Sequence, residues 1–195
     1  MKTILSLSAL SLIAVAPSAA MAQQAPPAVI VIIDANRIYR DCNACKTAQT
    51  QLQSRVTALT NRQKTLSDQL RNEGQPIEAA IRALNGKEPD AALRGRVTAF
   101  QTKQEQANQE LARSQENLRS IQANIMRQIN ARLNPAISQV MTARGANIAV
   151  EVGNTLAASQ SIDVTAAVLA AVNSTLPSVT LTPLPAQAQT QPPGR

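Results

Sequence analysis

Residues 93–125 read LRGRVTAFQTKQEQANQELARSQENLRSIQANI, and their apolar side chains recur in alternating steps of four and three residues. This repeat is typical of a helix with one face in a coiled-coil seam. The stripe consists of Leu93, Val97, Phe100, Gln104, Ala107, Leu111, Ser114, Leu118, Ile121 and Ile125. From Ile125 to Ile137 the steps become four, which locally unwinds a left-handed supercoil. We therefore predict one long helix from Asp90 to Arg144, kinked near Pro135.

A second stripe earlier in the chain predicts a helical partner for the first. It consists of Ala48, Leu52, Val56, Leu59, Gln63, Leu66 and Leu70. Gly74 and Pro76 interrupt it, so we expect a short separate helix over 77–84 that ends at Asn85-Gly86. Residues 37–144 then form an antiparallel helical hairpin. Polar or small residues at several seam positions weaken the apolar contact, so the two arms should be flexible.

Strand-like segments flank the hairpin on both sides. Val29 to Ile33 is a continuous β-branched run, after which Asp34 or Asn36 is expected to cap a helix. Residues 147–152 resemble a strand, and Gly153-Asn154 has the composition of a tight turn into a returning strand over 155–158. Asp163 is expected to cap a short closing helix. The predicted fold class is mainly α with a small β body, formed by residues 29–36 and 145–173.

The predicted body has about 40 residues, which is marginal for a structure that is stable alone. A buried strand on so small a body suggests that other copies of the chain cover it. We therefore predict an oligomer through the body, with contact residues Val29, Val31, Ile33, Ile148, Val150 and Val152.

The two ends of the chain differ in composition from the rest. Residues 1–22 have a basic Lys2, a short apolar run and the small-x-small pattern of Ala20-Met21-Ala22, which predicts a signal peptide cleaved near Ala22. Residues 23–28 form a linker. Proline recurs from Ser174 to the end, so we expect a disordered tail over 174–195. The mature protein is expected outside the cytoplasm.

The basic charge is concentrated on the predicted hairpin. Between Lys46 and Arg132 there are 14 basic and 8 acidic residues, a net charge of +6 against +7 for the whole chain. Such a face attracts acidic proteins, anionic lipid or nucleic acid, or is simply solvated. Export argues against nucleic acid.

Cys42 and Cys45 form a CxxC pair near a predicted helix start. In an oxidising compartment the pair favours a local disulfide, with redox exchange and a metal site as alternatives. A structural zinc site needs four ligands, and the sequence offers two Cys and no His.

The composition argues against an enzyme. The chain lacks His, and its carboxylates are scattered over predicted helix surfaces, so a nucleophile with its base is not apparent. A phosphate-binding GxxxxGK[ST] motif is absent from the sequence, and we expect no cofactor.

Three segments resemble the Skp/OmpH family of periplasmic chaperones: VIVIIDANRIY (29–39), ANIAVEVGNTLAAS (146–159) and SIDVTAAVLAAV (161–172). Together with the basic, Gln-rich hairpin between them, the resemblance covers residues 28–173. The Cys pair and the Pro-rich tail depart from the best-known members.

The resemblance implies a homotrimer whose bodies join and whose arms enclose unfolded outer-membrane β-barrel proteins without ATP. The arm residues that would face the partner arm or a client are Leu59, Leu66, Leu70, Val97, Phe100 and Leu111. Some members bind lipopolysaccharide, and by charge alone the candidates here are Arg119, Arg127 and Arg132. A second hypothesis is a structural role as a hairpin adaptor or spacer in the cell envelope.

Overall fold

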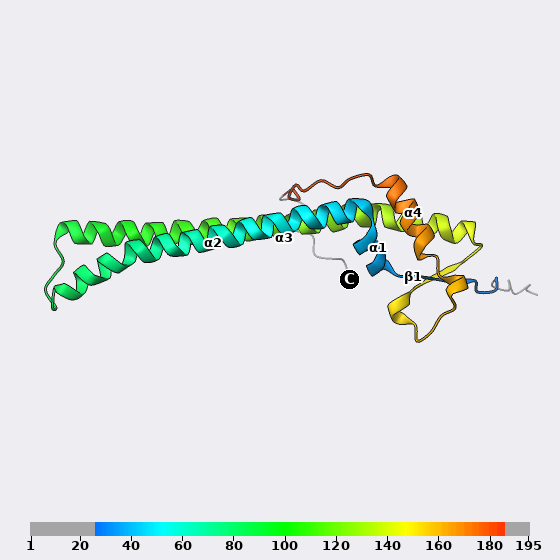
Figure 1. Ribbon diagram of the computed structural model, residues 1–195, viewed down its shortest axis with the longest axis horizontal. Helices are drawn as coiled ribbons and strands as arrows, with labels where there is room; N and C mark the ends of the chain where they lie inside the picture. Colours follow the sequence, from blue (N-terminus) through cyan, green and yellow to red (C-terminus); the bar gives the residue numbers. More distant parts are fainter. Residues whose placement is uncertain (1–25, 186–195) are drawn as a thin grey trace, which may run out of the picture.

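The computed structural model describes residues 26–185 as a long helical hairpin that projects from a small body (Figure 1). The predicted signal peptide, linker residues 23–25 and tail residues 186–195 lie outside the described residues. The order of elements is β1 (Ile30–Ile33), α1 (Ala35–Asp41), α2 (Asn43–Ala83), α3 (Ala91–Ala143), β2 (Ile148–Glu151) and α4 (Thr165–Thr175). This confirms the predicted fold class, which is mainly α with a small β part.

The longest helix, α3, begins and ends at residues with the expected capping chemistry. Asp90 caps α3, since its Oδ1 accepts a hydrogen bond from the Leu93 N–H at 2.7 Å. At the other end, Gly145 has a φ of 64°, and the Ala146 N–H bonds back to the Met141 carbonyl at 2.9 Å. The 53 residues of α3 span about 80 Å at ~1.5 Å per residue.

Helix α2 continues through Gly74 and Pro76, so the predicted break and the separate helix over 77–84 are wrong. The ring of Phe100 from α3 explains Gly74, because a Cβ at this position would lie 2.9 Å from the Phe100 Cζ. Ile77 is buried one turn further on. Packing against α3 thus outweighs the helix-breaking tendency of the two residues.

The two predicted stripes form the seam between α2 and α3. Their members are buried or half-buried, except for Gln63 and Gln104, which are exposed. Two ion pairs also join the arms: Arg62 Nε to Glu110 Oε1 at 2.6 Å, and Lys103 Nζ to Glu73 Oε2 at 2.6 Å. Because all four side chains are about half exposed, each pair adds little to stability.

The small sheet differs from the prediction. β2 pairs with β1 in parallel, from Ile30 opposite Ile148 to Ile33 opposite Glu151. The expected hairpin after β2 is wrong, since residues 152–154 form a 3-10 turn and residues 155–158 form no strand. Instead the chain crosses to the other edge of β1, where the Val164 N–H donates to the Ile32 carbonyl at 3.0 Å.

Side chains from β2 and its flank complete the hydrogen bonds of the first segment. Asn147 accepts from the Val29 N–H at 2.8 Å and donates to the Pro27 carbonyl at 2.9 Å. The Glu151 carboxylate accepts the Ala35 N–H at the start of α1. Residues more than 115 positions apart in sequence are thereby held together.

The hydrophobic core unites the body with the roots of both arms. α4 contributes Val168 and Val172 to this core, and Val164 at its N-cap joins them; all three are at most 2% exposed, as the sequence pattern predicts. Hydrogen bonds from Thr165 lower the pKa of Asp163 just before this helix. The core is therefore larger than the predicted body, because it also includes arm residues Ile121, Ile125, Ile129, Leu133, Ala136 and Val140.

The tail is ordered further than predicted. Leu176 is buried, Val179 and Leu181 pack against the core, and the chain then follows α3 as far as Pro185. The prediction of a disordered tail from Ser174 is therefore wrong for residues 174–185. The prolines prevent regular secondary structure, but side chains of α3 bond the tail backbone instead.

We expect Phe100→Ala to loosen the outer half of the hairpin, because the ring fills the space above Gly74. The loss should be about 1–2 kcal/mol, below the ~3–5 kcal/mol of a fully buried Phe, since Phe100 is half-buried. Amide hydrogen exchange of residues 66–84 and 93–107 measures this loss of local stability. Ile81→Ala, at a side chain 44% exposed, is the control. Equal acceleration by both substitutions would contradict the role of the ring.

Candidate functional site

An apolar surface is exposed at the small sheet. Val29, Ile30 and Ile148 are 42%, 44% and 41% exposed, and among the described residues the outer edge of β2 pairs with no strand. Of the residues predicted for the oligomer body, Val31 and Ile33 instead lie in the core of the same chain, at 4% and 3% exposure. Val150 and Val152 are half-buried. The surface available to another molecule is therefore the outer side and edge of the sheet.

The predicted arm residues all lie in the seam between α2 and α3. Leu66 is buried, whereas the other five remain half-exposed, so the seam is shared between the partner arm and solvent. A groove of about 270 Å³ opens beside Leu59, with Leu118 and Ile121 on the α3 side. Arg55 and Arg62 also line it. The groove thus offers apolar side chains next to guanidinium groups.

Arg62 is partly neutralised within this groove. Its hydrogen bond to the Glu110 carboxylate lowers the pKa of Glu110 and raises the pKa of Arg62. Both groups remain charged at neutral pH, so this ion pair joins the two arms under that condition.

A more apolar cavity of about 310 Å³ lies at the root of the arms, where α1, α2 and α3 meet. Met126 in its wall is 43% exposed, so this part of the cavity wall is accessible to solvent. Its lining residues are Tyr39, Cys45, Ala48, Gln49, Leu52, Gln122, Ile125, Met126 and Ile129. The sequence analysis did not select Met126, although an apolar residue beside the stripe, where steps of four begin, is a usable signal.

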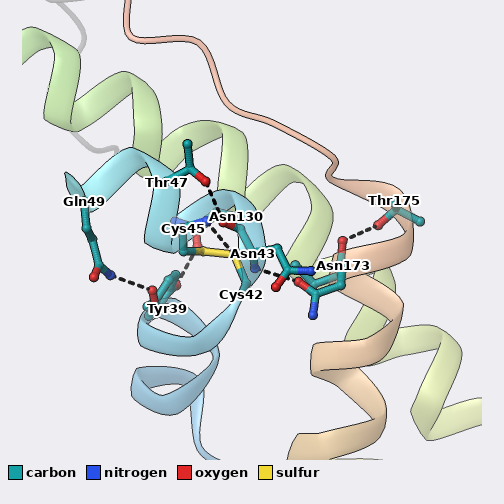
Figure 2. Close-up of a disulfide and its surroundings, with 10 residues drawn as sticks. Tyr39, Cys42, Asn43, Cys45, Thr47, Gln49, Asn130, Asn173 and Thr175 are labelled. Carbon is teal, nitrogen blue, oxygen red and sulfur yellow. Dashed lines mark hydrogen bonds between the residues drawn. A yellow bond between two sulfur atoms is a disulfide. The ribbon is translucent and has the colours of Figure 1, made fainter. Parts of the chain in front are cut away.

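Tyr39 is fixed at the edge of this cavity by polar contacts. Its hydroxyl donates to Asn130 Oδ1 at 2.6 Å, and its carbonyl accepts from Gln49 Nε2 at 3.0 Å (Figure 2). Burial, and to a lesser degree the charge of Glu151, raises the pKa of Tyr39. The phenol therefore stays protonated and keeps its hydrogen bond at neutral pH.

Cys42 and Cys45 form a disulfide at the junction of α1 and α2 (Figure 2). Cys42 also caps α2, because its Sγ accepts from the Cys45 N–H at 3.0 Å. The adjacent Asn43 N–H donates to Asn173 of α4 at 2.9 Å. With the two cysteines 0% and 2% exposed, the disulfide lies in the core, out of reach of a protein thiol.

The three arginines selected by charge do not share one face of α3. At ~100° per residue, Arg119 and Arg127 point about 80° apart and Arg132 lies about 140° further round. Arg119 lies near Glu116 at 3.9 Å, and Arg127 donates to Asn124 at 3.0 Å. Contact with anionic lipid remains a prediction, and a single chain does not gather these residues into a cluster.

These features define a class of protein: a helical hairpin on a small body, with apolar grooves along the arms and an exposed strand edge. No helix within residues 26–185 is long and apolar enough to cross a membrane. The chain matches the model of the outer membrane protein (OmpH-like) family over residues 29–172, and it belongs to this family. The resemblance seen in the sequence is thereby confirmed.

A crystal structure from Caulobacter crescentus CB15, of a candidate outer membrane chaperone (OmpH-like), is similar in fold. The TM-score is 0.67 at 18% sequence identity, and the match covers 83% of this chain and 95% of that chain. At this identity the likeness concerns the fold. None of the curated proteins matches this chain.

Replacing the disulfide by Cys42→Ser and Cys45→Ala keeps a capping oxygen at position 42 and removes the S–S bond. We expect the free energy of unfolding to fall by about 2 kcal/mol, because the closed loop is short. Urea unfolding followed by circular dichroism measures the change.

The unsubstituted chain should show no activity in an insulin-reduction assay. Turnover of insulin by the native chain would contradict a purely structural disulfide.

Proposed function

We propose that this protein is a periplasmic holding chaperone that binds unfolded outer-membrane β-barrel proteins without ATP. Its membership in the OmpH-like family supports this function. The observation that carries the proposal is the half-exposed apolar seam along two long arms. Such a surface can contact an extended chain at many weak points, whereas a tightly packed coiled coil would leave few apolar atoms free.

Charge and shape both favour unfolded clients. The surplus of basic residues on the arms attracts acidic chains over a distance. The groove at Leu59 and the cavity at Met126 then offer apolar contacts at two positions along the length of the hairpin. Holding by many weak contacts needs no covalent step, and release follows when the client reaches a partner that binds it better.

We further propose that several copies join through the exposed strand surface, as a trimer by analogy with the family. The free edge of β2 and the apolar side chains of Ile30 and Ile148 support this arrangement, since an uncovered apolar edge strand favours pairing with another chain. Joined bodies would place the arms around a shared space. The alternative, a hairpin spacer in the envelope, needs the arms but not their apolar grooves.

Purified mature protein should suppress the aggregation of a urea-denatured β-barrel protein on dilution, measured by light scattering without nucleotide. Met126→Gln should weaken client binding about fivefold, because a loss of ~1 kcal/mol of apolar contact corresponds to that factor. Ile81→Gln, equally exposed near the tip, is the matched control and should bind as the native chain does. A native chain that leaves aggregation unchanged would favour the spacer.

Ile148→Lys should lower the molar mass in solution toward that of one chain, because it places a charge on the strand surface. Size-exclusion chromatography with light scattering gives the mass. Ile81→Lys introduces the same charge at similar exposure far from the body and should leave the mass unchanged. A native protein that is already monomeric would contradict the proposed assembly.

A further inference from the structure

The tail after α4 runs back beside the hairpin toward its tip, and its path is set by hydrogen bonds to its backbone (Figure 1). Gln128 of α3 makes the central contact. Its side-chain Oε1 accepts from the Thr180 N–H at 2.9 Å, and its Nε2 donates to the Thr180 carbonyl at 3.0 Å. One amide side chain thus pairs with both backbone groups of a single residue, as a neighbouring strand would.

Two further side chains of α3 continue this pairing. Asn124 Nδ2 donates to the Thr182 carbonyl at 2.9 Å, and Ser120 Oγ accepts from the Leu184 N–H at 2.8 Å. Asn124 and Ser120 are 5% and 6% exposed beneath the tail. We call Ser120, Asn124 and Gln128 the amide row, although its first member, Ser120, contributes a hydroxyl.

The spacing of the amide row explains why an extended chain fits it. Four residues of helix advance about 6.0 Å, and two residues of strand advance about 6.6 Å. Side chains at i, i+4 and i+8 therefore meet every second residue of an antiparallel extended segment. The spacing involves only backbone groups of that segment, and the hydroxyls of Thr180 and Thr182 add longer contacts to Gln128 and Asn124, at 3.2 and 3.4 Å. The row therefore recognises mainly backbone.

The tail contributes apolar contacts on its other side. Val179 and Leu181 alternate with the bonded residues and pack against the core, while Leu176 anchors the segment after α4. The sequence VTLTPL at 179–184 thus has the alternation of a strand with one apolar face.

We propose that the amide row is a binding site for extended polypeptide and that the chain's own residues 178–184 occupy it as an internal ligand. Its other ligand is a strand-length segment of an unfolded client with alternating apolar residues, which competes with the tail. This second part rests on the proposed chaperone function. Tethering gives the tail an effective concentration in the millimolar range, so a client gains the site when its other contacts hold it nearby.

The test uses a fluorescein-labelled peptide of residues 177–185 (PSVTLTPLP) and the full mature chain. Val179→Ser with Leu181→Ser releases the tail in cis, and circular dichroism verifies that the chain remains folded. Fluorescence anisotropy should show the peptide binding this release variant at least tenfold more tightly than the native chain. Equal binding to both, or no binding to the folded release variant, would overturn the proposal.

Recognition of backbone is tested on both partners. Adding Asn124→Ala and Gln128→Ala to the release variant should weaken binding at least tenfold, whereas Gln115→Ala, at an exposed position on the opposite face of α3, should change it less than twofold. A peptide N-methylated at Thr180 and Leu184 loses two donors and should bind at least tenfold more weakly. A peptide with Thr180→Val and Thr182→Val loses only the longer hydroxyl contacts and should bind within about threefold of the unsubstituted peptide. If the valine peptide lost its affinity while the N-methylated peptide kept it, recognition of the backbone would be refuted.

Amide exchange on the native chain gives a readout without substitutions. The Thr180 and Leu184 amides should exchange at least tenfold more slowly than in the free peptide, and bound unfolded β-barrel protein should accelerate them. If a client bound but the Thr180 and Leu184 amides did not exchange faster, competition between client and tail would be refuted. The chaperone function would be unaffected by that result. A chain that fails to hold clients but binds the peptide as described would instead refute the proposed function alone.

Discussion

The parallel pairing of β1 with β2 is the constraint on which the rest of the structure depends. Two parallel strands cannot be joined by a tight turn and require a crossover connection. Here the crossover consists of α1 and the whole helical hairpin. When the two strands pair, they bring the two ends of the hairpin together at the body. Asn147 and Glu151 reinforce this closure through hydrogen bonds to Val29 and Ala35. The direction of the arms is therefore fixed at the body rather than along their length.

Packing becomes looser from the root of the arms toward their tip. At the root, the six core residues of α3 between Ile121 and Val140 are 2–8% exposed and share a core with α4. Further out, most seam residues are half-exposed, and Gln63 and Gln104 contribute no apolar burial. Since full burial of a large apolar side chain contributes ~1.5–3 kcal/mol, each such position leaves the outer arms less firmly joined. A rigid root with compliant arms is consistent with the proposed binding of chains without fixed shape.

The sequence predicts those features that depend on residues close together along the chain. The period of the stripes located both arms, and Asp34 and Asp90 cap helices, because periodicity and capping are local. Asp163, which was expected to cap α4, instead lies one residue before its N-cap Val164. The pairing partner of β2 is not local, so the turn-like Gly153-Asn154 suggested a hairpin although β1 was already in place. Gly74 was misread for the same reason, since the ring that requires a glycine comes from residue 100. The seam residues of the candidate site were therefore predicted, and the cavity beside Met126 was not.

The tail shows most clearly what composition leaves out. Prolines and threonines indicate that residues 177–185 form no regular ladder of hydrogen bonds with themselves. They do not exclude partners elsewhere, and Ser120, Asn124 and Gln128 supply them at a spacing that an extended chain matches. On α3 these three residues look like ordinary polar positions of a surface helix. Their burial beneath a backbone, rather than their identity, distinguishes them from the many other Gln and Asn residues of the arms. A surface that binds one extended segment through its backbone has little means of rejecting another.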